Sequence, residues 1–190
     1  MKEKLPWENE TQGKNLAWFL PRPKPDHYKG GMPLYGEEWI IKLACNLISN
    51  KDAEILHMFC GMGQIGFRVD ILPEVEPDLC CDCHKLSEHI DRKFDIILAD
   101  PPYSNEESKS LYGTPKINYK KWTSEADKLL NCGGLLIVYH KYVMPNPNPE
   151  KFFVEKRVFI GTRTYHLARV ATFFRKKQFE DIEQCRKKKL

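Results

Sequence analysis

A short apolar run that ends in an acid and two prolines places the strongest constraint on the fold of this chain. Residues 94–99 read FDIILA, and Asp100-Pro101-Pro102-Tyr103 follows directly. A run this short and apolar predicts a buried strand of a parallel sheet. In open α/β sheets, functional groups gather at the carboxyl ends of the strands. The sequence therefore predicts an α/β fold with a candidate site around Asp100.

The residue types of this tetrapeptide suit the transfer of a group to an amine on a flat aromatic ring. The lone pair of such an amine is delocalised, so a site must hold its N–H groups as the nitrogen becomes pyramidal. The Asp100 side chain and the Pro101 carbonyl can each accept one N–H, which stabilises the transition state. Pro101 and Pro102 stiffen the backbone, and Tyr103 offers a stacking surface. Taken by itself, the tetrapeptide is also compatible with a stiff loop without chemistry.

A second apolar run, residues 54–59, leads into a glycine-rich segment. Gly61, Gly63 and Gly66 give the pattern G-x-G-x-x-G, in which glycines let a ligand approach the backbone closely. No clear helix follows, because Gly66 and Pro73 interrupt the next residues. We expect the loop to enter the next strand directly, without the first helix that usually follows such a loop.

Two aspartates lie at or near the ends of the next two β-like stretches, residues 67–71 and 77–83. These are Asp70 and Asp82. One carboxylate can accept both hydroxyls of a ribose, and another can accept the amino group of adenine. The series from the glycine loop to Asp100 therefore predicts a cofactor that contains a nucleoside, held beside the reacting group.

A different register is possible for this segment. It makes Asp82 the ribose acid and residues 64–75 a helix. Gly66 and Pro73 oppose a regular helix there, and too few residues would then remain for a third strand before Phe94. We therefore prefer the register with a shortened loop, in which no helix N-terminus faces the cofactor's carboxylate.

With these motifs, the chain resembles the class I S-adenosylmethionine-dependent methyltransferases. Within that class, it is similar to the amino-methyltransferases that modify adenine N6 or cytosine N4 in DNA. The likeness covers roughly residues 15–175. It implies a Rossmann-like, mostly parallel sheet with a C-terminal antiparallel hairpin, S-adenosylmethionine as cofactor, and no metal.

The resemblance also assigns roles residue by residue. The glycine motif matches at Phe59, Cys60, Gly61 and Gly63, the ribose acid at Asp70, the adenine contact at Asp82 and Cys83, and the catalytic motif at Asp100, Pro101, Pro102 and Tyr103. Residues 24–33, followed by the apolar residues 39–44, are similar to the segment that folds over the methionine part of the cofactor.

The segment after the catalytic motif supplies candidate substrate contacts. Residues 104–115 are polar, and we expect them to form a loop that closes over a substrate. Tyr112 and Lys116, with Arg163 in a later turn, are candidates for contacts with an extruded base and its phosphates. The alternative is a solvated helix start with the tyrosine and tryptophan side chains in the core, because residues 122–130 have helical apolar spacing.

The last third of the chain predicts the end of the sheet. Residues 131–134 are a natural helix stop, and residues 135–140 form a buried strand. Residues 153–160 and 167–174 predict an antiparallel hairpin. A basic tail over residues 176–190 either attracts phosphates nonspecifically or serves only solubility.

Composition suits one domain over residues 1–190, with an extended arm over residues 1–35: the chain is 42% hydrophobic. No apolar run of about 18 residues or signal-peptide core is found, which predicts a cytoplasmic protein without a membrane segment. Seven cysteines, an odd number, indicate reduced thiols. The spacing of Cys80, Cys81 and Cys83 suits core packing better than zinc.

These patterns together predict methylation of an exocyclic amino group in DNA, with adenine N6 favoured. The alternatives are an rRNA or tRNA base amino-methyltransferase, and a noncatalytic subunit of the same fold that needs a partner. Nucleic acid is the expected partner, DNA rather than RNA, and a protein partner for target recognition stays open. The net charge of +4 does not by itself require nucleic acid.

Overall fold

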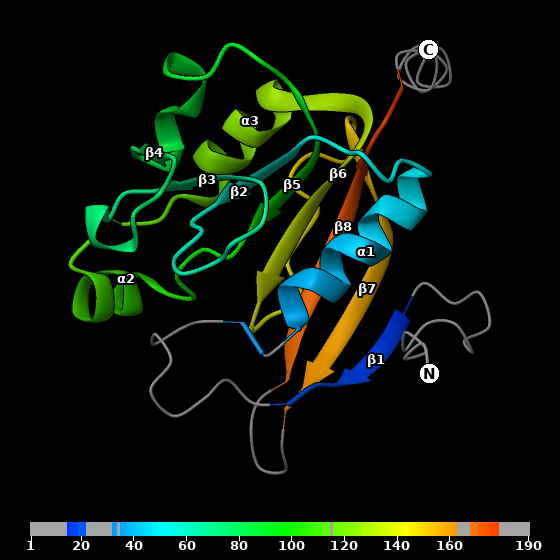
Figure 1. Cartoon of the computed structure of the whole chain (residues 1–190), viewed down its shortest axis with the longest axis horizontal. Helices are drawn as coiled ribbons and strands as arrows, with labels where there is room; N and C mark the ends of the chain where they lie inside the picture. The colour runs from blue at the N-terminus through cyan, green and yellow to red at the C-terminus, as the bar shows by residue number, and fades with distance from the viewer. Residues whose placement is uncertain (1–14, 22–31, 34, 115, 163–167, 179–190) are drawn as a thin grey trace.

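The computed structural model describes residues 15–21, 32–33, 35–114, 116–162 and 168–178. An eight-stranded sheet runs through this part of the chain in the order β1-β7-β8-β6-β5-β2-β3-β4 (Figure 1). The strands are β1 (Asn15–Phe19), β2 (Ile55–Met58), β3 (Phe67–Asp70), β4 (Leu79–Cys80), β5 (Phe94–Ala99), β6 (Leu130–His140), β7 (Phe152–Gly161) and β8 (Arg169–Lys176).

Among the described strands, the sheet is mostly parallel, and β8 is the antiparallel member. β8 runs antiparallel to both β6 and β7, whereas the other neighbouring strands are parallel. The predicted α/β class and the C-terminal hairpin are therefore confirmed. The helices are α1 (Gly36–Ile48), α2 (Asn105–Tyr112) and α3 (Tyr119–Leu129), and two short 3-10 turns span Pro73–Val75 and Cys83–Glu88.

Both faces of the central strands are covered, which explains why β5 is apolar without alternation. Ile96 and Leu98 join the core under α1, which crosses one face of the sheet in Figure 1. Ile97 and Ala99 point to the other face and join the core that includes Trp122 of α3. Each of these four β5 side chains is fully buried. This packing fixes the register of β5, and with it the position of Asp100 at its end.

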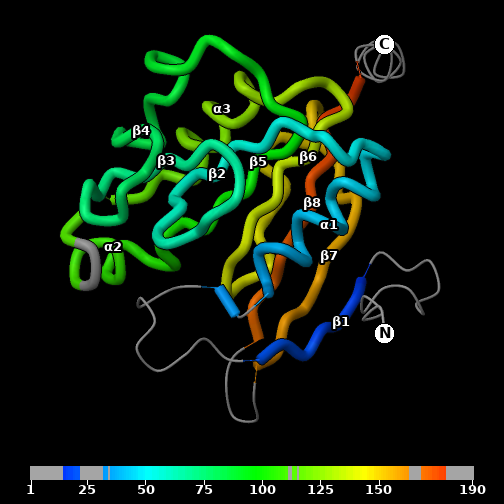
Figure 2. The backbone as a smooth tube through the Cα atoms, in the orientation of Figure 1, coloured from blue at the N-terminus to red at the C-terminus, as the bar shows by residue number. Residues whose placement is uncertain are grey.

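No helix separates β2 from β3, as the sequence predicts. The chain turns through residues 59–66 into Phe67, and the tube in Figure 2 shows this loop. Gly66 has a φ of 78°, in the left-handed region where glycine costs least. A Cβ at Gly66 would lie 2.7 Å from the Ile55 carbonyl oxygen, so the loop is pressed against the start of β2.

The expected loop over residues 104–115 is wrong for most of its length, because α2 occupies Asn105–Tyr112. Ser104 caps this helix by accepting a hydrogen bond from the Glu107 N–H at 3.1 Å. Glu107 in turn accepts from the Tyr103 N–H at 2.9 Å. Gly113 ends the helix in the left-handed region. These are the ordinary signals for the start and stop of a helix, and the polar composition obscured them.

The N-terminal arm also differs from expectation. β1 pairs in parallel with β7 at the edge of the sheet, so residues 15–19 are not an irregular extension. Leu16 and Trp18 are buried beside α1. Their alternation with exposed neighbours is the pattern of a half-covered strand. Most of the other residues of the arm lie outside the described part.

β6 begins earlier than the sequence predicts. α3 ends at Leu129 and the strand starts at Leu130, but its pairing with β5 is irregular until Leu135 faces Ile96. Residues 131–134 are thus a bulged entry to the strand rather than a separate turn. Among the described residues, no helix is both long and apolar enough to cross a membrane.

Candidate active site

The carboxyl ends of β2, β3, β4 and β5 meet at one edge of the sheet, because these four strands are parallel. The candidate residues follow directly at these ends: Phe59 after β2, Asp70 in β3, Asp82 beyond β4 and Asp100 after β5. The backbone N–H of Asp100 donates to the Met58 carbonyl at 3.3 Å. Asp100 and the glycine loop therefore begin one hydrogen bond apart.

Asp70 holds the glycine loop in place. Its Oδ2 accepts a hydrogen bond from the Gly61 N–H at 2.9 Å, and its Oδ1 accepts from the Leu72 N–H at 3.0 Å. Phe59 and Gly61 have φ angles of 55° and 48°. A left-handed conformation at a residue with a side chain costs on the order of 1–2 kcal/mol, and such strain is typical of functional loops. Asp70 thus ties the strained turn to the end of β3.

Glu37, in the first turn of α1, holds the second half of the loop. Its carboxylate accepts hydrogen bonds from the Ile65 N–H at 2.9 Å and the Gln64 N–H at 3.2 Å. The Nδ1 of buried His57 lies 3.2 Å from Glu37 Oε1. Burial by itself raises the pKa of Glu37, but these partners outweigh it and lower the pKa below its usual value. The sequence does not reveal this role of Glu37, because its partners lie far along the chain.

Gly63 lies directly against His57. A Cβ at this position would come within 2.4 Å of the imidazole and 2.9 Å of the Cys60 carbonyl oxygen. His57 is 2% exposed and lies in β2. The packing of the loop against His57 therefore requires glycine at Gly63, independently of any contact that this residue makes with a ligand.

His84 holds the Asp82 side chain in position. It accepts from the His84 N–H at 2.9 Å, and its Oδ1 lies 2.6 Å from His84 Nδ1. The His84 Nε2 accepts from the Asn118 N–H at 2.9 Å, which assigns the ring proton to Nδ1. Burial raises the pKa of Asp82, but the His84 hydrogen bonds outweigh it, so the pKa is lowered.

The thiols near the loop are not activated. Burial and the Asp70 charge raise the pKa of Cys60 to about 12. Cys83 is buried, and burial raises its thiol pKa well above the usual value. Cys80 is exposed and Cys81 is partly buried. Core packing is therefore correct for Cys83 and wrong for Cys80.

Asp100 lies between groups of opposite charge. Burial raises its pKa well above the usual value, Arg169 opposes this, and the Glu37 carboxylate adds to it. A side-chain hydrogen bond with Tyr103 lowers the pKa in turn. Arg169 Nε also donates to the Tyr103 hydroxyl at 3.2 Å.

The ring of Tyr103 is packed on more than one side. The guanidinium carbon of Arg169 lies 4.9 Å from its centroid, and the His140 ring meets it edge-on at 4.9 Å. The ammonium of Lys141 lies 5.7 Å from the same centroid and 3.0 Å from Glu107 Oε1. Tyr103 is therefore a fixed, partly covered ring and not a free platform.

The predicted substrate contacts are only partly located. Tyr112 ends α2 and its side chain is not described, Lys116 is exposed, and Arg163 lies outside the described residues. Trp122 is fully buried, and the Tyr119 hydroxyl donates to the Pro145 carbonyl at 2.6 Å. The core alternative is correct for these last two residues.

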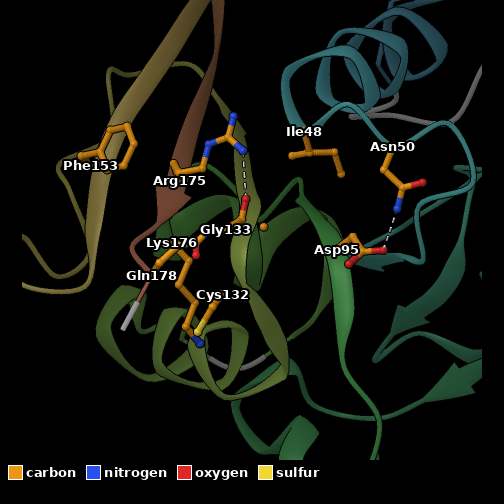
Figure 3. A pocket seen from close by; sticks show the side chains of 10 residues that line it. Ile48, Asn50, Asp95, Cys132, Gly133, Phe153, Arg175, Lys176 and Gln178 are labelled. Carbon is orange, nitrogen blue, oxygen red and sulfur yellow. Dashed lines mark hydrogen bonds between the residues drawn. The ribbon is translucent and has the colours of Figure 1, made fainter. Parts of the chain in front are cut away.

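A pocket of about 420 Å³ lies away from these residues, at the amino ends of β5 and β6 (Figure 3). Asp95 on its wall accepts from the Asn50 amide at 3.3 Å, and Arg175 donates to the Gly133 carbonyl at 2.9 Å. These polar groups hold strand ends together. Because β5 runs from this pocket toward Asp100, the two features occupy opposite edges of the sheet.

No family model matches the chain, and no curated protein matches it. Solved structures do match. TrmN from Thermus thermophilus is 16% identical, with a TM-score of 0.56, over 78% of this chain and 50% of that one. N-methyltransferase NodS from Bradyrhizobium japonicum WM9, in complex with S-adenosyl-L-homocysteine, is 14% identical, with a TM-score of 0.55, over 75% of this chain and 86% of NodS.

PH1948 from Pyrococcus horikoshii, described as a candidate RNA methyltransferase, is 12% identical, with a TM-score of 0.53, over 85% of this chain and 94% of PH1948. The chain therefore has the Rossmann-like fold of class I methyltransferases. It spans half the length of TrmN.

Proposed function

We propose that this chain is an S-adenosylmethionine-dependent methyltransferase that methylates an exocyclic amino group of a base in RNA. One observation carries the proposal. The backbone of Asp100 bonds to the last residue of β2, Met58, at 3.3 Å. A proton acceptor and a glycine loop therefore share one edge of the sheet, and the fold matches that of methyltransferases. Sheets of this kind bind ligands at that edge.

The cofactor assignment is supported by the geometry of the loop. Asp70 lies at the end of β3 and Asp82 just beyond β4, the places from which carboxylates reach a ribose and an adenine. Each already accepts hydrogen bonds within the protein, and a carboxylate has about four lone-pair sites, so capacity remains. NodS, which shares the fold, is in complex with S-adenosyl-L-homocysteine.

When bound, S-adenosylmethionine would supply an electrophilic methyl group, whose transfer to the amino nitrogen would leave the electron pair of the broken sulfur–methyl bond on sulfur. The Asp100 carboxylate and the Pro101 carbonyl accept the two N–H groups and stabilise the developing positive charge. The excess proton then leaves to Asp100 or to solvent. Burial raises the pKa of Asp100, and Arg169 opposes this rise, so Arg169 favours the charged form, which is the stronger acceptor.

RNA is proposed rather than DNA because of PH1948, a candidate RNA methyltransferase. PH1948 matches 85% of this chain, a larger share than TrmN or NodS matches. Adenine N6 of DNA is the second candidate, and the observation that favours it is the intact Asp100-Pro101-Pro102-Tyr103 sequence. A noncatalytic subunit is disfavoured, because Arg169 and Tyr103 surround Asp100 as a working acceptor would require.

The experiment is transfer of a labelled methyl group from S-adenosylmethionine to total RNA, single-stranded DNA and duplex DNA, followed by digestion to nucleosides. We expect label in RNA and its loss in Asp100→Ala. The matched control is Asp52→Ala, which removes an exposed acid before β2 and is expected to retain activity. Label only in DNA favours the second candidate, and absence of label with any substrate contradicts the catalytic proposal.

A further inference from the structure

Three aromatic rings lead from the catalytic motif to the surface. The Tyr103 and His140 ring centroids are 4.9 Å apart, and the His140 and Tyr142 centroids are 5.5 Å apart. His140 is the last residue of β6 and is 6% exposed, whereas Tyr142 is 60% exposed. The series therefore begins beside Asp100 and ends in an aromatic side chain open to solvent.

The outer end of this series is held in position. The Tyr142 N–H donates to His140 Nδ1 at 3.1 Å. Burial and the nearby Lys141 charge lower the pKa of His140 to about 4, so Nδ1 is an acceptor at neutral pH. Lys141 is fixed by its 3.0 Å contact with Glu107, and its ammonium lies 5.5 Å from the Tyr142 centroid. Tyr142 thus projects from an ordered backbone beside a fixed positive charge.

This combination has a chemical preference. An exposed aromatic ring next to a cation stacks on the flat face of a nucleobase, and each such stack contributes to binding without reading sequence. A base inside a duplex has both faces covered by its neighbours, whereas an unpaired base has a face to offer. Val143 is also exposed and extends the apolar surface at the same place.

We propose that Tyr142 is a binding subsite for the unpaired nucleotide next to the methylated one, so the substrate is single-stranded or locally unpaired nucleic acid. The inference rests on the proposed function. Tyr103 lies beside Asp100, and Tyr142 lies two residues past the end of β6. A nucleic acid strand that places one base at Asp100 therefore brings the adjacent base to the Tyr142 ring.

The test compares Tyr142→Ala, Tyr142→Phe and Tyr142→Trp in the full chain. The probes are one fluorescein-labelled oligonucleotide sequence as single-stranded RNA, as single-stranded DNA, and as the RNA and DNA duplexes. Fluorescence anisotropy gives Kd for each. Phe153→Ala is the matched control, because Phe153 is also an exposed aromatic side chain but lines the pocket at the opposite edge.

We expect Tyr142→Ala to raise Kd for single strands by about 5- to 150-fold, while the Phe and Trp variants stay near the wild-type value. Duplex binding and the Phe153→Ala variant are expected to change little. In the methyl-transfer assay, Tyr142→Ala raises KM and leaves kcat unchanged. Loss for the RNA strand alone, or for both strands, supports the subsite and identifies the polymer it accepts.

Unchanged single-strand Kd in Tyr142→Ala overturns the subsite. An equal loss for duplexes also overturns it, because that result indicates a general effect on phosphate binding or folding. A thermal melt of each variant excludes unfolding as the cause. Binding is measured without turnover, so failure of methyl transfer and failure of the subsite give different results.

Discussion

Arg169 Nε donates to the Tyr103 hydroxyl at 3.2 Å, and the guanidinium carbon lies 4.9 Å from the same ring. Arg169 is the first residue of β8, in the antiparallel hairpin, so the last strand of the sheet reaches the motif after β5. Burial and Glu37 raise the pKa of Asp100, and Arg169 is the main group that opposes them. We infer that Arg169 acts through Asp100 as a positioning residue.

Replacing Arg169 is therefore expected to change the pH dependence of methyl transfer. The ionised Asp100 carboxylate accepts an N–H more strongly than the neutral acid and can take up the excess proton, so activity falls as the pH drops through its pKa. Arg169→Met raises that pKa further, and the acid limb of kcat/KM moves to higher pH. Once the pKa that sets this acid limb lies above neutral pH, activity at neutral pH falls about tenfold for each further pH unit of the shift. Arg169→Lys, which keeps the charge, is expected to move the limb less.

An acid limb that stays in place in Arg169→Met would contradict this role. A uniform drop in kcat/KM at all pH values would instead assign Arg169 to holding the Tyr103 ring. The melting temperature of each variant, measured over the same pH range, separates both results from a loss of folded protein.

Asp100→Asn is expected to stabilise the protein while it removes activity. A raised pKa means that the folded state binds the Asp100 proton more tightly than the unfolded state. Stability from this group is therefore lost as the pH rises from the unfolded pKa through the folded one, and the charged form is unfavourable at neutral pH. Asparagine removes that charge, so the melting temperature rises at pH 7, and methyl transfer falls by about 10²- to 10³-fold.

The measurement is a pair of denaturant titrations of wild type and Asp100→Asn at pH 4 and pH 7. The gain in stability is expected at pH 7 and to shrink at pH 4, where the native carboxyl is also neutral. A variant that is less stable than wild type at both pH values would show that the hydrogen bonds of Asp100 to its neighbours outweigh its burial.

The strand pattern and the edge of the sheet that carries the candidate site could be predicted from the sequence, because local signals determine both. Apolar runs set β2, β5 and β6, and the acids that follow them are adjacent in the chain to those runs. The direct entry of the glycine loop into β3 was predictable for the same reason, since Gly66 and Pro73 interrupt a helix.

What the sequence did not reveal depends on contacts between distant segments. Glu37 bonds to the loop amides 27 and 28 residues away, and Arg169 reaches Tyr103 across 66 residues. No periodicity or spacing encodes such pairs. β1 was missed because the alternation of its five residues between buried and exposed positions depends on their packing beside α1. The helix α2 had a capping signal at Ser104 and Glu107 that could have found it.

Gly63→Ala is expected to disrupt the glycine loop, and removing His57 should relieve part of the effect. The new Cβ meets the imidazole at 2.4 Å and the Cys60 carbonyl at 2.9 Å. Overpacking of this kind costs about 1–3 kcal/mol. In His57→Ala the ring is absent, so adding Gly63→Ala should cost less, although the Cys60 contact remains. Denaturant titration of the two single variants and the double variant gives the coupling free energy.

A favourable coupling free energy in this cycle supports direct packing of the loop on His57. Strictly additive costs would show that the Cys60 carbonyl alone sets the requirement for glycine. Met62→Ala is the control, because Met62 lies in the same loop but is exposed, and it is expected to change stability by less than about 0.5 kcal/mol.

Glu37→Gln is expected to weaken cofactor binding, because the loop has lost the helix that normally follows it and depends on this carboxylate. Hydrogen bonds to charged groups contribute about 1.5–3 kcal/mol each. The Gln64 and Ile65 amides both donate to Glu37, so Kd for S-adenosyl-L-homocysteine should rise by at least about tenfold in calorimetry. Glu38→Gln is the matched control, since Glu38 is exposed and forms a surface ion pair with Lys42.

The Glu37 interaction should also show in the pH dependence of stability. Its pKa is lowered in the folded state, so its contribution is present above the unfolded pKa of about 4.3 and is lost as the pH falls through the folded pKa. Wild type and Glu37→Gln should therefore differ most at neutral pH and converge in acid, whereas Glu38→Gln follows wild type throughout. If Glu37→Gln binds the cofactor as tightly as Glu38→Gln does, the loop is held by Asp70 alone, and α1 has no part in the site.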